Sequence, residues 1–125
     1  WLRIGVCLRE YILQFEDKKW QCDYAATFFE RGIGLLGRKT YPPNRIMVIP
    51  KCGSVHTWFM RFAIDVVFLD KCGTVLCIEY NVSPWRMLFG GSKASITLEA
   101  MSPMDGGASA FAGIHIGDRI SIIEK

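Results

Sequence analysis

The chain has 125 residues, of which 50% are hydrophobic and 13% aromatic, and this composition excludes an intrinsically disordered protein. Its formal net charge of +3 comes from basic residues spread along the chain rather than gathered in a stripe, so we expect no nucleic-acid partner. No segment approaches the ~20 consecutive apolar residues of a membrane span, so we expect no membrane partner either.

The first predicted element is an N-terminal helix over residues 25–36. Asp23 precedes it as a candidate N-cap, because its carboxylate can accept hydrogen bonds from the free backbone N–H groups of the first turn. Apolar residues recur at intervals of three and four and give the helix one apolar face. These residues are Ala25, Phe28, Phe29, Gly32 and Leu36. Pro42-Pro43-Asn44 then predicts a loop.

The middle of the chain predicts a β-hairpin. Residues 64–69 are rich in β-branched and aromatic side chains, which favours a strand. Residues 70–73 (Asp-Lys-Cys-Gly) have the composition of a tight turn. Residues 74–80 would then return antiparallel to the first strand.

Other short apolar segments, bounded by glycine or proline, also predict strands. They cover residues 46–49, 55–60, 94–98, 114–116 and 119–123. One helix with many short strands indicates a mainly β fold, namely a small antiparallel barrel or sandwich with one N-terminal α-helix. No linker or internal repeat divides the sequence, so residues 1–125 are expected to form a single domain.

Three segments together are similar to a known family. The most specific one, residues 56–70, contains His-Thr-x-x-Met-x-x-x-x-Asp-Val-x-Phe-Leu-Asp. The second, residues 31–38, reads Arg-Gly-Ile-Gly-Leu-Leu-Gly-Arg, and the third combines Leu98-Glu99 with residues 117–120 (Gly-Asp-Arg-Ile). Over roughly residues 20–123 the chain resembles the uncharacterised bacterial and archaeal family catalogued as domain of unknown function 192.

The resemblance implies a compact, mainly β fold with one helix. It implies no activity, because none is established for the family. The chain departs from the family between Glu99 and Gly117, where residues 100–107 form a longer loop than the usual short Pro-Ala-Gly turn. A site rim built by this loop would therefore differ in this protein.

Cys52, His56 and Asp65 suggest a thiol nucleophile, its base and a carboxylate that orients the base. On an extended strand four residues span ~13 Å, so direct contact between Cys52 and His56 needs a bend. Gly53 allows this bend and does not require it. In the favoured alternative Cys52 is a small buried side chain and His56 hydrogen-bonds to a backbone carbonyl, because unpaired cysteine is among the most buried residue types.

The same segment could also form a metal site or an anion-binding site. Cys52, His56 and Asp65 or Asp70 could ligate a metal, but the clustered cysteine pairs of zinc sites are missing, so we expect no metal and no cofactor. Arg61 fits an anionic ligand, because a guanidinium matches carboxylate and phosphate. A structural ion pair of Arg61 with Asp65 or Asp70 is the favoured alternative.

Aromatic and thioether side chains gather in two segments. They are Trp58, Phe59, Met60, Trp85 and Met87. They predict either a wall around an apolar or sugar-like ligand or plain core. Because Trp58 and Met60 would share a strand face with His56, the mixed polarity favours a pocket wall. Trp85 follows Ser83-Pro84 and is predicted in a loop, partly exposed.

The sequence thus favours a non-catalytic module that binds a small ligand or a protein segment beside the strand pair holding Cys52 and Asp65. The expected ligand-binding residues are Cys52, His56, Trp58, Met60, Arg61, Asp65 and Trp85, and no catalytic residue is expected. The alternative function is a thiol- or metal-dependent hydrolase that uses Cys52, His56 and Asp65. Five cysteines, an odd number without regular spacing, favour reduced and mostly buried thiols and a cytoplasmic location.

Overall fold

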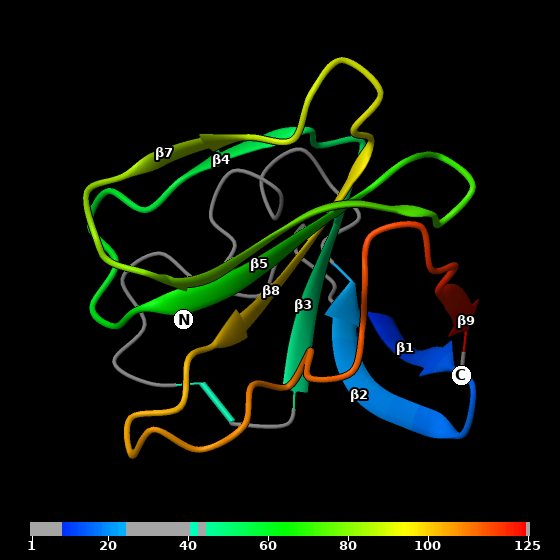
Figure 1. Cartoon of the computed structure of the whole chain (residues 1–125), viewed down its shortest axis with the longest axis horizontal. Helices are drawn as coiled ribbons and strands as arrows, with labels where there is room; N and C mark the ends of the chain where they lie inside the picture. Colours follow the sequence, from blue (N-terminus) through cyan, green and yellow to red (C-terminus); the bar gives the residue numbers. More distant parts are fainter. Residues whose placement is uncertain (1–8, 25–40, 43–44, 125) are drawn as a thin grey trace.

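The computed structural model describes residues 9–24, 41–42 and 45–124. Within them nine strands form a seven-stranded and a two-stranded sheet (Figure 1). The strands are β1 (Arg9–Phe15), β2 (Lys18–Tyr24), β3 (Arg45–Pro50), β4 (Ser54–His56), β5 (Ile64–Leu69), β6 (Val75–Val82), β7 (Met87–Phe89), β8 (Ile96–Met101) and β9 (Ser121–Glu124). The predicted helix over residues 25–36 lies outside the described residues.

The large sheet has the strand order β6-β5-β8-β3-β2-β1-β9 and curls into a half-barrel (Figure 1). Its neighbours are antiparallel except for β2 and β3, which run parallel. The predicted mainly antiparallel β architecture is therefore confirmed. The small sheet pairs β4 with β7, and Figure 1 shows it along one side of β5.

The predicted central hairpin is confirmed as β5 and β6. Asp70 shapes its turn, because the Oδ1 atom accepts hydrogen bonds from the backbone N–H groups of Cys72 (2.8 Å) and Thr74 (3.0 Å). The bond from Thr74 is the main cause that lowers the pKa of Asp70. Gly73 completes the turn with a φ of 89°, and a Cβ atom there would collide with the backbone oxygen of Ile120.

Three of the predicted strands are wrong in extent or in kind. Strand β4 ends at His56, where residues 55–60 were predicted as one strand, because the chain turns and the N–H of Met60 bonds back to the oxygen of Thr57 at 3.1 Å. Residues 114–116 form no strand, because the chain makes two successive turns here: the N–H of Ile114 bonds to the oxygen of Phe111, and the N–H of Asp118 bonds to the oxygen of His115. The predicted strand at 94–98 runs instead from Ile96 to Met101.

Asp23, predicted to cap the helix, belongs to strand β2. Its carboxylate accepts hydrogen bonds from the Tyr41 hydroxyl (2.6 Å) and from the Arg45 guanidinium (2.6 and 3.0 Å). This arrangement ties the end of β2 to the start of its parallel neighbour β3.

Two hydrophobic clusters lie on the two faces of the large sheet. The first cluster includes Val67, Leu69, Leu98, Phe111 and Ile114. The second cluster includes Met47, Met60, Ile64, Val66 and Phe68. All six residues of β5 are buried, and its five apolar side chains alternate between the two clusters. The small sheet covers the second cluster with Val55 and Leu88.

Among the described cysteines Cys22 is buried, Cys52 and Cys77 are half-buried and Cys72 is exposed. The prediction of mostly buried thiols is thus wrong for Cys72, which lies in the turn after β5. Within the described part of the chain no helix has the length and hydropathy that a membrane crossing needs.

Candidate functional site

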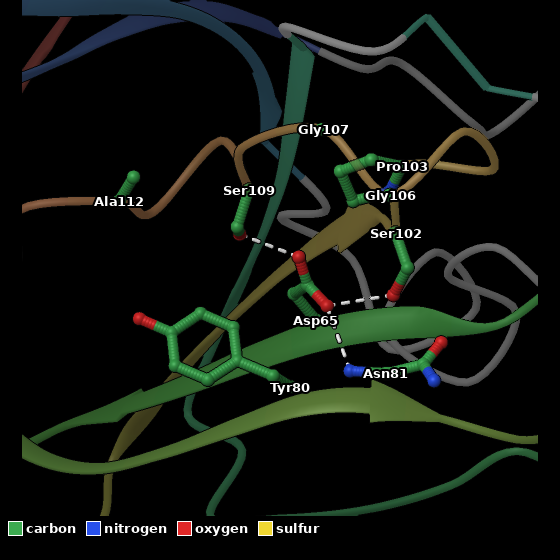
Figure 2. A pocket seen from close by; sticks show the side chains of 9 residues that line it. All are labelled: Asp65, Tyr80, Asn81, Ser102, Pro103, Gly106, Gly107, Ser109 and Ala112. Carbon is green, nitrogen blue, oxygen red and sulfur yellow. Dashed lines mark hydrogen bonds between the residues drawn. The ribbon is translucent and has the colours of Figure 1, made fainter.

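An open pocket of about 450 Å³ lies where β5 and β6 meet the loop that follows β8. Figure 2 shows Asp65 at its centre, with Tyr80 and Asn81 contributed by β6 and Ser102 and Ser109 by the loop. This volume is within the range typical of small-molecule sites. We call it the Asp65 pocket.

The Asp65 carboxylate is 1% exposed and is held by neutral donors. Its Oδ1 atom accepts hydrogen bonds from the backbone N–H of Asn81 (2.8 Å) and the hydroxyl of Ser102 (2.6 Å). Its Oδ2 atom accepts one from the hydroxyl of Ser109 at 2.5 Å. A carboxylate has about four acceptor positions, so one position on Oδ2 stays open among the described residues.

The loop carrying the two serines is anchored on both sides of the pocket. The backbone N–H of Ser102 donates to the oxygen of Ala63 at 3.0 Å. At the other side the Ser109 hydroxyl accepts from the N–H of Phe111 (3.1 Å), and the Phe111 side chain is buried in the first cluster. Trp20 donates to the oxygen of Ala110 at 2.8 Å. The serine hydroxyls are thus positioned by the folded core.

The rim of the Asp65 pocket includes residues 103, 106 and 107, which belong to the loop where the sequence departs from the resembled family. Sequence reasoning singled out Asp65 and this loop separately, and it missed both serines. Their signal was weak, because Ser102 lies 37 and Ser109 lies 44 residues from Asp65 along the chain.

The structure does not bring Cys52, His56 and Asp65 together. The thiol of Cys52 donates to the backbone oxygen of Ser54 at 3.0 Å, and the His56 ring stacks on Trp58 with a centroid distance of 4.9 Å. Asp65 lies on the face of β5 that carries the first cluster. Strand β4, which holds His56, covers the second cluster on the opposite face of the sheet. The described residues include no group of three potential metal ligands.

The predicted aromatic residues divide between surface and core. Met60 is 6% exposed and packs in the second cluster, so it does not share a face with Trp58. The side chain of Trp58 stays at the surface, 42% exposed. Arg61 is exposed and forms no ion pair with any described residue, so the favoured pairing with Asp65 or Asp70 is not formed among these residues.

The outer side of the small sheet carries both polar and large apolar side chains. His56 pairs with Met87 and Ser54 pairs with Phe89 across the two strands, and these four side chains are exposed. Met87 is 50% and Phe89 is 72% exposed. We define the aromatic face as the exposed side chains on and beside this ribbon, namely His56, Trp58, Phe59, Trp85, Met87 and Phe89.

The end of the ribbon holds an exposed aromatic pair. The rings of Phe59 and Trp85 lie 4.8 Å apart, and both residues adopt left-handed backbone angles, with φ of 66° and 69°. The buried Thr57 fixes this conformation, because its Oγ1 donates to the oxygen of Ser83 (2.8 Å) and accepts from the N–H of Arg86 (2.7 Å). Large residues adopt such angles rarely, and strained positions of this kind cluster at functional sites.

A buried carboxyl group lies on the opposite face of β8 from the first cluster. Glu99 is 5% exposed, between Met47 of β3 and Val66 of β5. Removal from water disfavours its charged form and raises the pKa of Glu99 to about 7.

Comparison with known proteins gives relatives of undefined activity. The chain is 31% identical over 103 residues to "UPF0127 protein PF1050" of Pyrococcus furiosus, covering 78% of this chain and 82% of that protein. It is 30% identical over 100 residues to a "UPF0127 protein" of Thermococcus sibiricus, covering 77% of this chain. The match spans 62% of the Thermococcus protein's length.

A solved structure shows the same fold. A protein of unknown function from Novosphingobium aromaticivorans superposes with a TM-score of 0.70 at 18% identity, covering 90% of this chain and 83% of that one. The sequence also matches the DUF192 family, described as "Uncharacterized ACR, COG1430", over residues 11–122. The resemblance found in the sequence is thereby confirmed, and this chain belongs to the uncharacterised DUF192 family.

Proposed function

We propose that this protein is a non-catalytic binding module whose aromatic face docks an acidic segment of a partner protein. The observation that carries the proposal is the concentration of exposed apolar side chains on one two-stranded ribbon. Phe59, Trp85 and Phe89 are each more than half exposed, with values of 65%, 61% and 72%. Grouped exposed aromatic residues mark interaction surfaces, whereas single ones are ordinary.

The aromatic face is held in place before any partner binds. Thr57 bonds to both Ser83 and Arg86, and its backbone N–H and oxygen pair with Arg86 (2.8 Å) and Trp85 (2.9 Å). On the inner side of the ribbon, Val55 and Leu88 pack into the second cluster. A surface that is already ordered loses less conformational entropy on binding, which supports a docking role.

The charge around the aromatic face indicates an acidic partner. Residues 51–64 and 82–98, which carry the whole face, contain no aspartate or glutamate. Their charged residues are basic and exposed, and they are Lys51, Arg61, Arg86 and Lys93. Complementary charge steers a partner and rejects partners of like charge.

His56 favours a polypeptide over a lipid surface. Its imidazole lies within the apolar surface, against Trp58 and opposite Met87. A covered imidazole needs a hydrogen-bond partner, because burying a polar group without one is costly. A peptide supplies carboxylates and backbone oxygens at this point, and lipid chains supply none.

The proposal is tested with a random peptide library displayed on phage and selected on the wild-type protein. We expect the selected peptides to be enriched in aspartate, glutamate and aromatic residues. Trp85→Ala should weaken the best peptide at least about tenfold, the effect of losing an interface hot spot. Arg86→Glu should weaken it by a similar factor. Met104→Ala is the matched control, because Met104 is 88% exposed outside the aromatic face and should leave binding unchanged.

Three results would overturn the docking proposal. The first is selection of peptides without acidic enrichment, and the second is equal binding to Trp85→Ala and wild type. The third is displacement of the peptide by vesicles of phosphatidylcholine and phosphatidylserine, which would assign the aromatic face to a membrane surface instead.

We also propose a cytoplasmic location, supported by the odd number of cysteines and the exposed thiol of Cys72. Fractionation of cells that express the full-length gene should recover the protein in the cytoplasmic fraction. Recovery from an extracytoplasmic fraction would contradict this location.

A further inference from the structure

We infer that the Asp65 pocket is a second binding site and that its ligand carries a primary ammonium group. This inference is independent of the docking proposal, because the Asp65 side chain and the aromatic face belong to opposite sides of β5. It is carried by three features of the pocket: an uncompensated buried carboxylate, an aromatic ring at the opening and a limited volume.

The negative charge of Asp65 has no cationic partner among the described residues. Among the described residues that line the pocket, Asp65 is the one charged side chain. Its hydrogen-bond donors, Asn81, Ser102 and Ser109, are all neutral. The nearby ammonium of Lys18 bonds to the backbone oxygen of Ala112 and forms no ion pair with Asp65. A buried charge is costly unless it is paired, so a cation gains most at this position.

An ammonium group fits the open acceptor position better than a neutral hydroxyl does. Either group can donate a fourth hydrogen bond, to the free position on Asp65 Oδ2. A hydroxyl leaves the net charge of the site unchanged, whereas an ammonium compensates it and forms a charge-assisted bond.

Tyr80 supplies a further contact for a bound cation. The Tyr80 side chain is 51% exposed and lines the same pocket as Asp65 (Figure 2). An aromatic ring in this place stabilises a cation through its face. Asn81 takes part through its backbone N–H, which donates to Asp65 Oδ1 at 2.8 Å, whereas Figure 2 shows its side-chain amide directed away from the carboxylate.

The volume of about 450 Å³ is typical of a small-molecule site and accommodates a short aliphatic ammonium. Two sources supply the required chemistry, namely a free alkylamine and the lysine side chain of a protein segment. Both present the same primary ammonium on a short aliphatic chain. The inference concerns this shared ammonium group, and a titration with both kinds of compound distinguishes the two sources.

The experiment is an NMR titration of the ¹⁵N-labelled full chain with four probes: n-butylammonium, 1-butanol, glucose and Nα-acetyl-lysine amide. The reporter is the backbone N–H of Asn81, which bonds directly to Asp65. We expect saturable shifts of this signal with the two ammonium compounds and none with 1-butanol or glucose. Tighter binding of the lysine derivative identifies a protein segment as the source, and equal binding identifies a free amine.

Variants separate binding from folding. Asp65→Asn keeps the shape of the side chain, removes its charge, and should weaken n-butylammonium about tenfold or more. If Asp65→Asn fails to fold, the variants of Tyr80 still test the inference. Tyr80 is half exposed, so its replacement should leave the fold intact. Tyr80→Ala should weaken binding about two- to fivefold, and Tyr80→Phe should retain it, because the ring alone stabilises the cation. Equal shifts with 1-butanol or glucose, no shift with any ammonium probe, or full affinity in Tyr80→Ala would each overturn the inference.

Discussion

Replacing Glu99 by glutamine should make the protein more stable at neutral and alkaline pH. Glu99 is 5% exposed, and its neighbours across the sheet, Met47 and Val66, carry no titratable group. No described residue pairs with its carboxylate. The substitution Glu99→Gln removes the ionisable group and keeps a side chain of similar size, so it isolates the free-energy cost of the buried charge.

The expected magnitude follows from the raised pKa of Glu99, which is about 7 in the folded protein against an ordinary value of 4.5. Below pH 4.5 the carboxyl is protonated in both states and the charge has no effect on stability. Between 4.5 and 7 the unfolded chain loses the proton and the folded protein keeps it, so stability falls as the pH rises. Above pH 7 the full cost is reached, about 3 kcal/mol.

Urea unfolding of wild type and Glu99→Gln across this pH range measures the effect. The free energy of unfolding of the wild type should decline relative to the variant from pH 4.5 to 7 and then run parallel to it. Glu79→Gln, an exposed position on β6 that β5 separates from the strand of Glu99, is the control and should not change the slope. A constant difference between wild type and Glu99→Gln at every pH would refute the reasoning.

Three further predictions test the core, a turn and the thiol. Phe68→Ala should destabilise the protein by about 3–5 kcal/mol because Phe68 is fully buried, and an unchanged urea midpoint would show otherwise. Gly73→Ala should cost more than about 1 kcal/mol in thermal unfolding. Gly91→Ala should cost less, since its φ is also positive but no atom lies within 4 Å of the added Cβ. Cys52 should react with iodoacetamide at the rate of an ordinary thiol in peptide-resolved labelling; fast labelling at about pH 6 that His56→Ala abolishes would contradict this.

The fold was predictable from the sequence where a strand is buried on both faces and is followed by residues typical of a tight turn. Residues 64–69 form a continuous apolar segment followed by a turn with glycine, and both predictions are confirmed in β5 and its hairpin. The hairpin of β1 and β2 was missed, although Trp20 and Cys22 alternate with polar residues in β2. Its turn is formed by Glu16 in a left-handed conformation (φ 54°), so the usual glycine or asparagine signal is missing.

The candidate sites were also predictable only in part, because many of their contacts join residues that are far apart in the sequence. Local sequence identified Asp65 and Trp85, because a carboxylate in an apolar strand and an aromatic residue after proline are visible within a few residues. The partners of Asp65 come from a loop whose position depends on the packing of Phe111 in the core. The pairing of Phe59 with Trp85 depends on hydrogen bonds made by Thr57 across 26 and 29 residues. Contacts of this kind follow from tertiary structure.

The position of β9 has a consequence for the order in which the protein assembles. Strand β1 is the first of the described strands to be synthesised, yet Tyr11 pairs with Glu124 in β9, the last of them. During translation one edge of β1 therefore has no native neighbour until nearly all of this sequence has left the ribosome. An unpaired edge attracts other strands, so the nascent chain is most prone to aggregation during this interval. Chaperone dependence should accordingly centre on the N-terminal hairpin, whose strand β2 also holds the loop beside the Asp65 pocket through Lys18 and Trp20.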